Sequence, residues 1–315
     1  MRKIYAQVAL LMALIVILSA GITAFTGTVR PQSQRLRVVA TFYPVYIAAL
    51  NVAGGADGVE VQNLVGAQTG CLHDYQLSPD NLMTIEGADV LVMNGAGAEP
   101  FLDPVLAAHP ELPVVDTSEG VPLLESGHLH QHGEEAEPAH GDVDEHGINE
   151  HIWMSPTRYI QQVENLRDGL CAADPSHADA YARNADAYIA QIRQVWTQLQ
   201  EAAAGIPYRH VVTFHDSLSY LAEDLNWEVV AALSVGEEDG VSANDLSAAY
   251  DAVSRAGDVL FLYDTQYPSL TYDNLTQAAA RGATVWVDTA VGGPDSPDAW
   301  LQAMTKTAQA LFALA

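Results

Sequence analysis

The sequence has few basic residues. It contains 13 Lys and Arg against 40 Asp and Glu, which gives a formal net charge of -27 over 315 residues. A nucleic-acid partner requires clustered Lys and Arg side chains to neutralise phosphates, so we expect no nucleic-acid binding. A strongly acidic surface instead favours solubility and raises the local concentration of cations.

Cysteine is equally scarce. The chain contains only Cys71 and Cys171. In an oxidising compartment these two could form one disulfide, which is the interpretation we prefer. Two unpaired thiols remain an alternative, as does thiol ligation of a metal, because Cys71 lies two residues before His73. No cysteine follows the N-terminal apolar run, so we expect no lipid attachment through an N-terminal cysteine.

The N-terminus combines a basic start with a long uncharged segment. Arg2 and Lys3 precede a mostly apolar run from Ile4 to Phe25. This pattern predicts a signal peptide or an N-terminal membrane anchor over residues 1–31, since the run approaches the ~20 residues that span a bilayer. In both cases we expect the rest of the chain to be extracytoplasmic, at the cell surface or in the periplasm, secreted or tethered by the uncleaved segment.

One segment is rich in histidine. Six of the eleven histidines fall between positions 128 and 151, together with acidic residues and no Lys or Arg. Imidazoles and carboxylates without structural periodicity can capture borderline divalent cations such as Zn²⁺. We therefore predict secondary metal capture by His128, His130, His132, His140 and His146. The alternative is a solvated acidic spacer whose histidines are incidental.

Short apolar strands alternate with helical segments along the mature chain, which predicts an α/β fold with mostly parallel sheets. The mature length of about 280 residues suits two domains. Ser78-Pro79 and Ser155-Pro156 each read as a helix start, with Ser as the N-cap. We expect strands at 37–41, 59–65, 88–94, 114–115, 209–214, 227–231, 259–263 and 284–287. Further helices are expected at 43–52, 218–224, 243–256 and 272–281, and from about 296 onwards.

The longest helical pattern runs from about Ser176 to Ala204. At 1.5 Å per residue it would be roughly 40 Å long, more than one small lobe requires. We interpret it as a rigid helix that joins two lobes. The predicted division is an N-terminal lobe at 36–173 with its His-rich loop at 126–150, a connecting helix at 174–205 and a C-terminal lobe at 206–315.

Four potential metal ligands follow strands or precede a helix start: His73, His151, His215 and Asp288. Ligand groups in open parallel sheets collect beyond the carboxyl ends of the strands. Three imidazoles and one carboxylate would form a tetrahedral set suited to zinc. Taken singly, each histidine could be an ordinary loop or capping residue, and Asp288 a turn acid.

Several motifs together resemble the metal-binding solute-binding proteins of bacterial zinc and manganese ABC importers. The matching segments are Thr41-Phe42-Tyr43-Pro44, Gly70-Cys71-Leu72-His73-Asp74-Tyr75, Asn149-Glu150-His151-Ile152-Trp153, Thr213-Phe214-His215-Asp216 and Val287-Asp288-Thr289. The resemblance implies two α/β lobes joined by a rigid helix, with the metal between them. His73 and His151 would come from the first lobe, and His215 and Asp288 from the second.

The resemblance also implies a receptor that binds metal and passes it to a membrane permease, with no enzymatic step. Histidine at position 215, where manganese-type members commonly carry glutamate, indicates zinc as the ion and makes manganese the lesser expectation. Asp216 beside His215 is a candidate acceptor for a ligand imidazole N–H. Asp264, which stands where many relatives have glutamate, is a second such candidate. We expect the protein to be a monomer.

Three alternatives remain open. A manganese-binding receptor of the same family would use the same residues. A secreted zinc-dependent hydrolase would use three histidines and leave the fourth metal position to water. Against the hydrolase, the sequence contains neither an HExxH helix nor a nucleophile elbow. An extracellular metal buffer or adhesin that serves no transporter is the third.

Overall fold

The computed structural model describes residues 35–66, 72, 75–126, 147–233, 241–267 and 273–315. The chain divides into two units, Met1–Leu36 and Arg37–Ala315. All helices and strands named below lie in the second unit, apart from Leu36, the first residue of β1. The predicted leader, Cys71, His73 and the five histidines between 128 and 146 lie outside the described residues.

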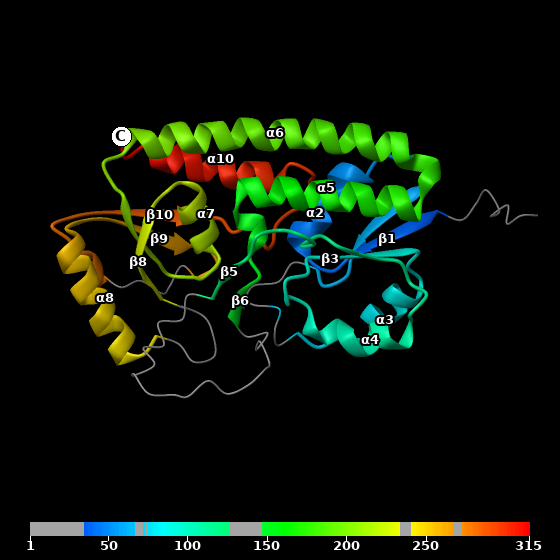
Figure 1. The fold of residues 1–315 in the computed structure, drawn as a ribbon, viewed down its shortest axis with the longest axis horizontal. Coiled ribbons are helices and arrows are strands. Elements are labelled where there is room, and N and C mark those ends of the chain that lie inside the picture. The colour runs from blue at the N-terminus through cyan, green and yellow to red at the C-terminus, as the bar shows by residue number, and fades with distance from the viewer. Residues whose placement is uncertain (1–34, 67–71, 73–74, 127–146, 234–240, 268–272) are drawn as a thin grey trace, which may run out of the picture. The chain divides into compact units, whose positions relative to one another are not determined.

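The first half of the second unit forms a four-stranded sheet in the order β2-β1-β3-β4, of which β1 and β3 are labelled in Figure 1. Its strands are β1 (Leu36–Ala40), β2 (Val59–Asn63), β3 (Val90–Met93) and β4 (Val114–Asp116). The pairings of β1 with β3 and of β3 with β4 are parallel. The central strands are almost completely apolar and buried, which is typical of parallel strands covered on both faces. Helices α2 (Tyr43–Val52), α3 (Pro79–Glu86) and α4 (Asp103–Ala108) connect them.

The second half repeats this architecture with a four-stranded parallel sheet in the order β10-β9-β7-β8. Its strands are β7 (His210–Thr213), β8 (Glu228–Ala232), β9 (Asp258–Asp264) and β10 (Arg281–Val287). Helices α7 (Leu218–Asp224), α8 (Ala243–Ala256) and α9 (Asp273–Thr276) connect them. In both sheets the first and third strands in sequence form the centre.

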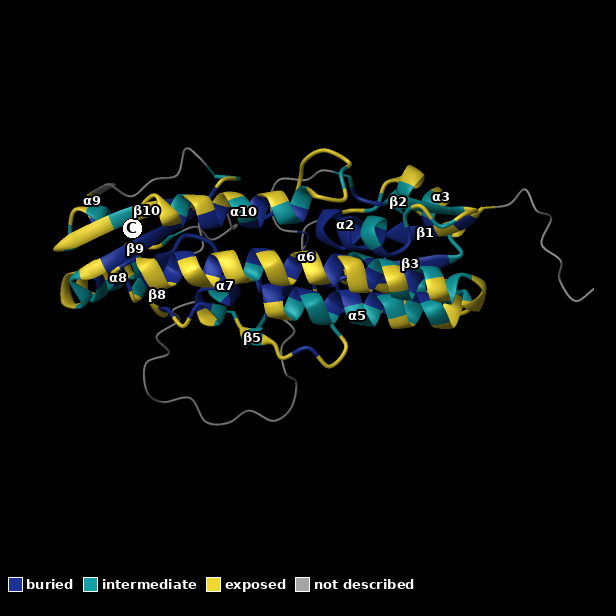
Figure 2. Cartoon of the chain, turned by 90° about the horizontal axis from the view of Figure 1, so that it is seen from above, coloured by how far each residue is buried: buried dark blue, intermediate teal, exposed yellow. Residues whose placement is uncertain are grey.

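A layer of three long helices connects the two sheets. Helix α6 (Ala178–Gly205, 28 residues) packs against α2 and α5 (Pro156–Ala173) in its first part and against α10 (Ala299–Phe312) elsewhere. Its buried positions, among them Tyr181, Tyr188, Ile192 and Leu199, recur at helical spacing and so share one face of the helix. In Figure 2, which looks down on α6, exposed residues alternate with buried and intermediate ones along the helix. This confirms the predicted α/β fold with parallel sheets and a long helix.

Local sequence signals predicted the positions of most helices and strands correctly. Ser78 and Ser155 both cap their helices by accepting a hydrogen bond from the backbone N–H three residues later. The prediction of a helix over 272–281 was wrong in length, because α9 ends at Thr276 and Arg281 already pairs with Asp258. Tertiary pairing therefore overrides the helix propensity of the alanines between them. The last helix begins at Ala299 rather than at 296.

The antiparallel pair β5 (Leu124–Glu125) and β6 (Ile148–Asn149) was not predicted. It joins the two ends of the segment that contains the His-rich loop. Within the described residues, no helix is long and apolar enough to cross a membrane.

Candidate metal centre

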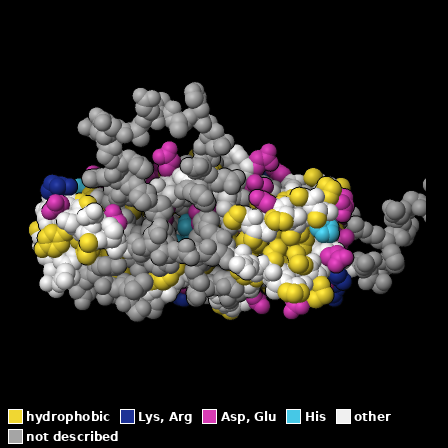
Figure 3. Space-filling view, turned by 90° about the horizontal axis from the view of Figure 1, so that it is seen from below, with side chains coloured by type: hydrophobic (Ala, Val, Ile, Leu, Met, Phe, Trp, Pro, Cys, Tyr) yellow, Lys and Arg dark blue, Asp and Glu magenta, His cyan; other side chains and the backbone are white. Residues whose placement is uncertain are grey.

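A small pocket lies at the carboxyl ends of the two sheets. Its volume is about 20 Å³, which is room for roughly one water-sized particle. In the space-filling view of Figure 3 a histidine side chain lies recessed in a hollow on this face. The lining comes from both halves of the chain: Phe42, Gly66, Leu72, Ala98, Glu150, His151, Trp153, His215, Ser217, Gln266, Thr289 and Val291.

His151 is held in one orientation by Asn149. The Asn149 amide nitrogen donates to the backbone oxygen of Asp216 at 2.9 Å, which fixes the amide so that its oxygen faces His151. That oxygen accepts the backbone N–H of His151 at 3.1 Å and lies 3.0 Å from its Nδ1. A neutral His151 therefore carries its proton on Nδ1, and the lone pair on Nε2 is available to a metal ion.

His215 lies just beyond β7 and is buried. Its Nδ1 accepts the backbone N–H of Ser217 at 3.3 Å and lies 2.8 Å from the hydroxyl oxygen of the same residue. Burial, and then the proximity of His151, lower the pKa of His215 to about 3. The imidazole is therefore neutral at physiological pH, which is the form that coordinates metals.

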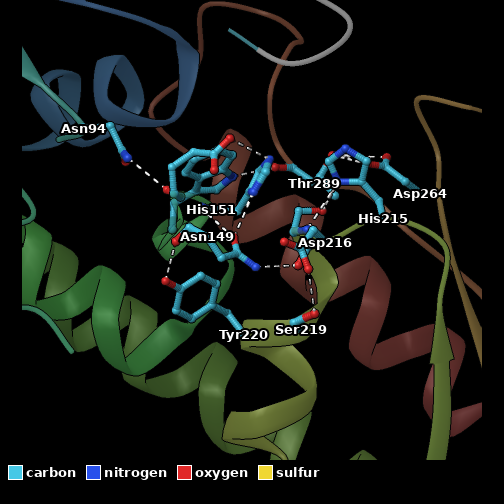
Figure 4. Close-up of polar contacts among 12 residues, drawn as sticks. Asn94, Asn149, His151, His215, Asp216, Ser219, Tyr220, Asp264 and Thr289 are labelled. Atoms are coloured by element: carbon cyan, nitrogen blue, oxygen red, sulfur yellow. Dashed lines mark hydrogen bonds and ion pairs between the residues drawn. The ribbon is translucent and has the colours of Figure 1, made fainter. Parts of the chain in front are cut away.

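The fold brings these two histidines together from opposite halves of the chain. Their ring centroids are 5.1 Å apart at an interplanar angle of 84°. Figure 4 shows the connecting network, in which Asn149 contacts both Asp216 and Tyr220. The Tyr220 hydroxyl donates to the backbone oxygen of Asn149 at 2.5 Å. The β6 segment and the start of α7 are thus joined beside both imidazoles.

Asp264 ends β9 and is buried close to the pocket. Its carboxylate accepts the backbone N–H of Gln266 at 2.8 Å and the hydroxyl of Thr289 at 3.1 Å. Burial raises the pKa of Asp264 to about 6 despite these hydrogen bonds and the nearby His151. Gln266 and Thr289 line the pocket, so Asp264 orders part of the pocket wall.

The other two predicted acids, Asp216 and Asp288, differ in burial and in their contacts. Asp216 is buried beside His215, and its Oδ1 is 3.4 Å from the Ser219 hydroxyl oxygen. Asp288 does not line the pocket: its side chain is 36% exposed, and one of its oxygens lies 4.0 Å from the Lys306 ammonium. The other oxygen accepts the backbone N–H of Ala290 at 3.0 Å.

Glu150 is a pocket residue that sequence reasoning missed. It is buried, lines the pocket and places Oε1 at 3.7 Å from Nε2 of His151. The only sequence signal was its position next to a predicted ligand. Side chains that follow one another in a loop rarely point to the same place, so the structure was needed to identify it.

Of the four predicted ligands, His151 and His215 lie close together, and Asp288 lies outside the pocket. His73 lies outside the described residues, within which no group of three His, Cys, Asp or Glu side chains is arranged to hold a metal. Cys171 forms no disulfide with any described residue, and its sulfur lies 3.6 Å from the backbone oxygen of Ala178. Because Cys71 also lies outside the described residues, the disulfide stays a prediction.

A paired two-lobe α/β fold with a small histidine-lined pocket defines the class of a metal-binding solute-binding protein. The family model described as zinc-uptake complex component A, periplasmic (ZnuA), matches residues 38–313. The chain therefore belongs to the ZnuA family, which consists of solute-binding proteins.

Two curated proteins are similar to this chain in sequence. The iron-binding protein YfeA of Yersinia pestis is 30% identical over 211 residues, which is 65% of this chain and 62% of the relative. The zinc-binding lipoprotein AdcA of Streptococcus pneumoniae is 30% identical over 227 residues, covering 70% of this chain and 43% of the relative. The chain therefore spans less than two thirds of the length of either protein.

Solved structures share the fold. The solute-binding protein FpvC of Pseudomonas aeruginosa, in complex with Ni²⁺, gives a TM-score of 0.72 at 23% identity, covering 89% of this chain and 96% of that one. A crystal structure of ZnuA gives a TM-score of 0.67 at 22% identity, covering 88% and 99%. At these identities the likeness establishes the fold alone.

Proposed function

We propose that this protein is an extracytoplasmic receptor that captures Zn²⁺ and delivers it to the permease of an ABC importer. The observation that carries the proposal is the convergence of His151 and His215, from opposite halves of the chain, on one buried pocket. Two imidazole nitrogens form a donor pair that suits zinc. The ligand set that we propose from the sequence is His73, His151, His215 and Asp288.

The pocket favours a single ion over an organic substrate. Its volume of about 20 Å³ accommodates one small particle, whereas sites for organic ligands usually enclose several hundred cubic ångströms. This supports binding and delivery rather than a zinc-dependent hydrolase. The similar proteins include one named as zinc-binding, one named as iron-binding, and one solved in complex with Ni²⁺ and with Mn²⁺, so manganese, iron and nickel are the competing ions to test.

The remaining parts of the proposal come from the sequence. Residues 1–31 would direct or anchor the chain outside the cytoplasm, and 174–205 would connect lobes at 36–173 and 206–315. The histidines from His128 to His146 would hold further zinc more weakly. The receptor would act as a monomer that docks on the permease.

Zinc and manganese titration of residues 32–315 tests the function, next to His215→Ala and, as a matched control, His177→Ala. His177 is a partly exposed histidine paired with Asp174, in the segment before α6 rather than in the pocket. We expect one tight zinc equivalent, weaker manganese binding, and loss of the tight equivalent only in His215→Ala. Tight zinc binding that survives His215→Ala would refute the site.

A further inference from the structure

Helices α3 and α4 carry apolar side chains but bury few of them. Helix α3 buries only Ile85, and α4 buries no residue. Leu82 is 44% exposed and Met83 is 62% exposed. Figure 3 shows hydrophobic side chains gathered over these two helices, on the same face as the recessed histidine. We call this surface the α3–α4 patch, and its members are the exposed or half-buried residues Leu82, Met83, Phe101, Pro104, Val105 and Leu106.

The α3–α4 patch is fixed to the wall of the pocket. Asn81, in the first turn of α3, donates from its side-chain amide to the backbone oxygen of Leu64 at 2.7 Å, two residues before the pocket residue Gly66. The Tyr75 hydroxyl donates to the Asn81 side-chain oxygen at 2.9 Å, and its ring lies edge-on to that of Phe101, with centroids 5.1 Å apart. The surface therefore has its shape before any partner arrives, which lowers the entropy lost on association.

The charges around the patch are all acidic. Between Arg37 and Arg158 the sequence contains no Lys or Arg, and α3 and α4 carry the exposed acids Asp80, Glu86 and Asp103. A complementary partner therefore has apolar side chains at the centre of its contact surface and Lys or Arg at the rim. A second copy of this acidic surface would be repelled, and so would an anionic membrane surface.

We propose that the α3–α4 patch is the surface on which the extracytoplasmic side of the importer permease docks. This inference rests on the proposed function and deepens it, because it assigns the contact with the permease to particular residues and gives its chemistry. Large exposed apolar groups on a soluble domain mark interaction sites. A partner seated on the patch would lie directly beside the pocket from which the ion must leave.

Uptake of ⁶⁵Zn tests the inference, in cells that lack their own copy of the protein and express full-length variants. Leu82→Asp and Met83→Asp each place a charge in the apolar centre, so each should lower uptake at least about tenfold. The matched control is Phe312→Asp. Phe312 is 47% exposed on α10, which lies on the side of the molecule opposite α3 and α4 (Figure 1). Its uptake should stay within about twofold of the unmodified protein.

Zinc titration of the purified full-length proteins separates docking from capture. Leu82 and Met83 do not line the pocket, so both variants should bind zinc within about twofold of the unmodified affinity. Thermal unfolding checks that each variant folds. Sedimentation with vesicles of phosphatidylethanolamine and phosphatidylglycerol should be equal for Met83→Asp and the unmodified protein. Weaker sedimentation of Met83→Asp would assign the patch to lipid and overturn the proposal.

Photocrosslinking identifies the partner directly. In Met83→p-benzoylphenylalanine, irradiation of the cells should give a product with the membrane-spanning permease, which mass spectrometry of the product identifies. Phe312→p-benzoylphenylalanine should give no such product. Crosslinks from position 83 only to lipid, to other copies of this chain or to proteins other than the permease would contradict docking at the patch.

The outcomes separate this inference from the proposed function. If Leu82→Asp and Met83→Asp support the same uptake as the unmodified protein, docking at the patch is wrong, although the uptake itself still supports the receptor. If Phe312→Asp loses as much uptake as they do, the assignment to the patch is wrong as well. If the unmodified protein restores no zinc uptake to the cells, the proposed delivery of zinc itself is wrong.

Discussion

The two sheets share one strand order but differ in the chemistry at their carboxyl ends. In each sheet, in sequence order, the second strand is an edge, followed by the first, the third and the fourth. The first sheet ends beside the buried carboxylate of Glu99, which accepts hydrogen bonds from the Thr41 hydroxyl at 2.6 Å and the Asn94 backbone at 2.7 Å. The second ends beside Asp264 and His215.

This difference shows that two sheets with the same strand order need not carry the same residues at their carboxyl ends. Both halves bury one carboxylate that accepts a threonine hydroxyl and a backbone N–H: Glu99 with Thr41, and Asp264 with Thr289. Only the second sheet follows its first strand with a histidine, where the first has Thr41-Phe42. The pocket therefore arises where the two halves meet, and neither half supplies both described imidazoles.

The largest loss of stability should follow removal of a connection between the halves. Asp224, at the end of α7, has a side chain that is only 8% exposed. It accepts hydrogen bonds from Ser155, Thr157 and Arg158 at the start of α5. Asp224→Ala leaves these donors without their acceptor, so we expect a loss of about 3–4 kcal/mol in the free energy of unfolding.

Urea unfolding measures that change. Glu223→Ala is the matched control, because its side chain pairs with the same arginine but is 50% exposed. Its expected loss is about 0.5 kcal/mol. Equal losses in the two variants would mean that Asp224 does not connect the halves.

Acidification should weaken zinc binding, because protons compete with the metal for imidazole nitrogen. Each histidine ligand with an ordinary pKa near 6.5 should lower the affinity about 25-fold between pH 7 and pH 5. His215 should contribute little above pH 5, since its pKa is lowered to about 3. Zinc titration at fixed ionic strength measures this, and an affinity that is constant over the window would exclude a histidine ligand of ordinary pKa.

Glu99 should make the apo-protein less stable as the pH rises. Burial raises its pKa from 4.5 to about 7, so the folded state binds more protons than the unfolded state between these values. Its contribution to stability is complete below pH 4.5 and is lost as the pH rises towards 7, on the order of 2–3 kcal/mol. Glu99→Gln should flatten this part of the profile.

Unfolding free energies measured from pH 4.5 to pH 8 check the sign. Asp264→Asn is the comparison in the other half, where the carboxyl pKa is raised from 3.8 to about 6, so it should flatten the profile at lower pH. A Glu99→Gln profile parallel to that of the unmodified protein would contradict the raised pKa.

The smallest effects should come from the two Val-Asp-Thr turns, in which Asp116 and Asp288 each accept the backbone N–H two residues later. Asp116→Asn and Asp288→Asn retain a side-chain oxygen that can accept the same backbone N–H, so each should lower stability by less than about 1 kcal/mol. Thermal unfolding of the apo-proteins measures both. A much larger loss in one variant would show that the turns are not alike.

The fold was largely predictable because its signals are local. Apolar runs such as Val259–Tyr263 indicated buried parallel strands, and serine followed by proline located two helix starts. The length of α9 was not predictable, because the pairing of Arg281 with Asp258 ends the helix before its propensity does.

The site was only partly predictable. The rings of His151 and His215 lie close together, whereas the role of both as metal ligands stays a prediction. The inward position of Glu150 depends on the backbone turn after β6, and the outward position of Asp288 on its contact with Ala290. The spacing of apolar residues in the sequence contains no information on the position of either side chain.

Anomalous diffraction at the zinc absorption edge, from crystals of the zinc-loaded protein, tests the central claim most directly. The claim predicts one strong peak within bonding distance of Nε2 of both His151 and His215. A fully occupied zinc site elsewhere, with no peak between these two imidazoles, would contradict it.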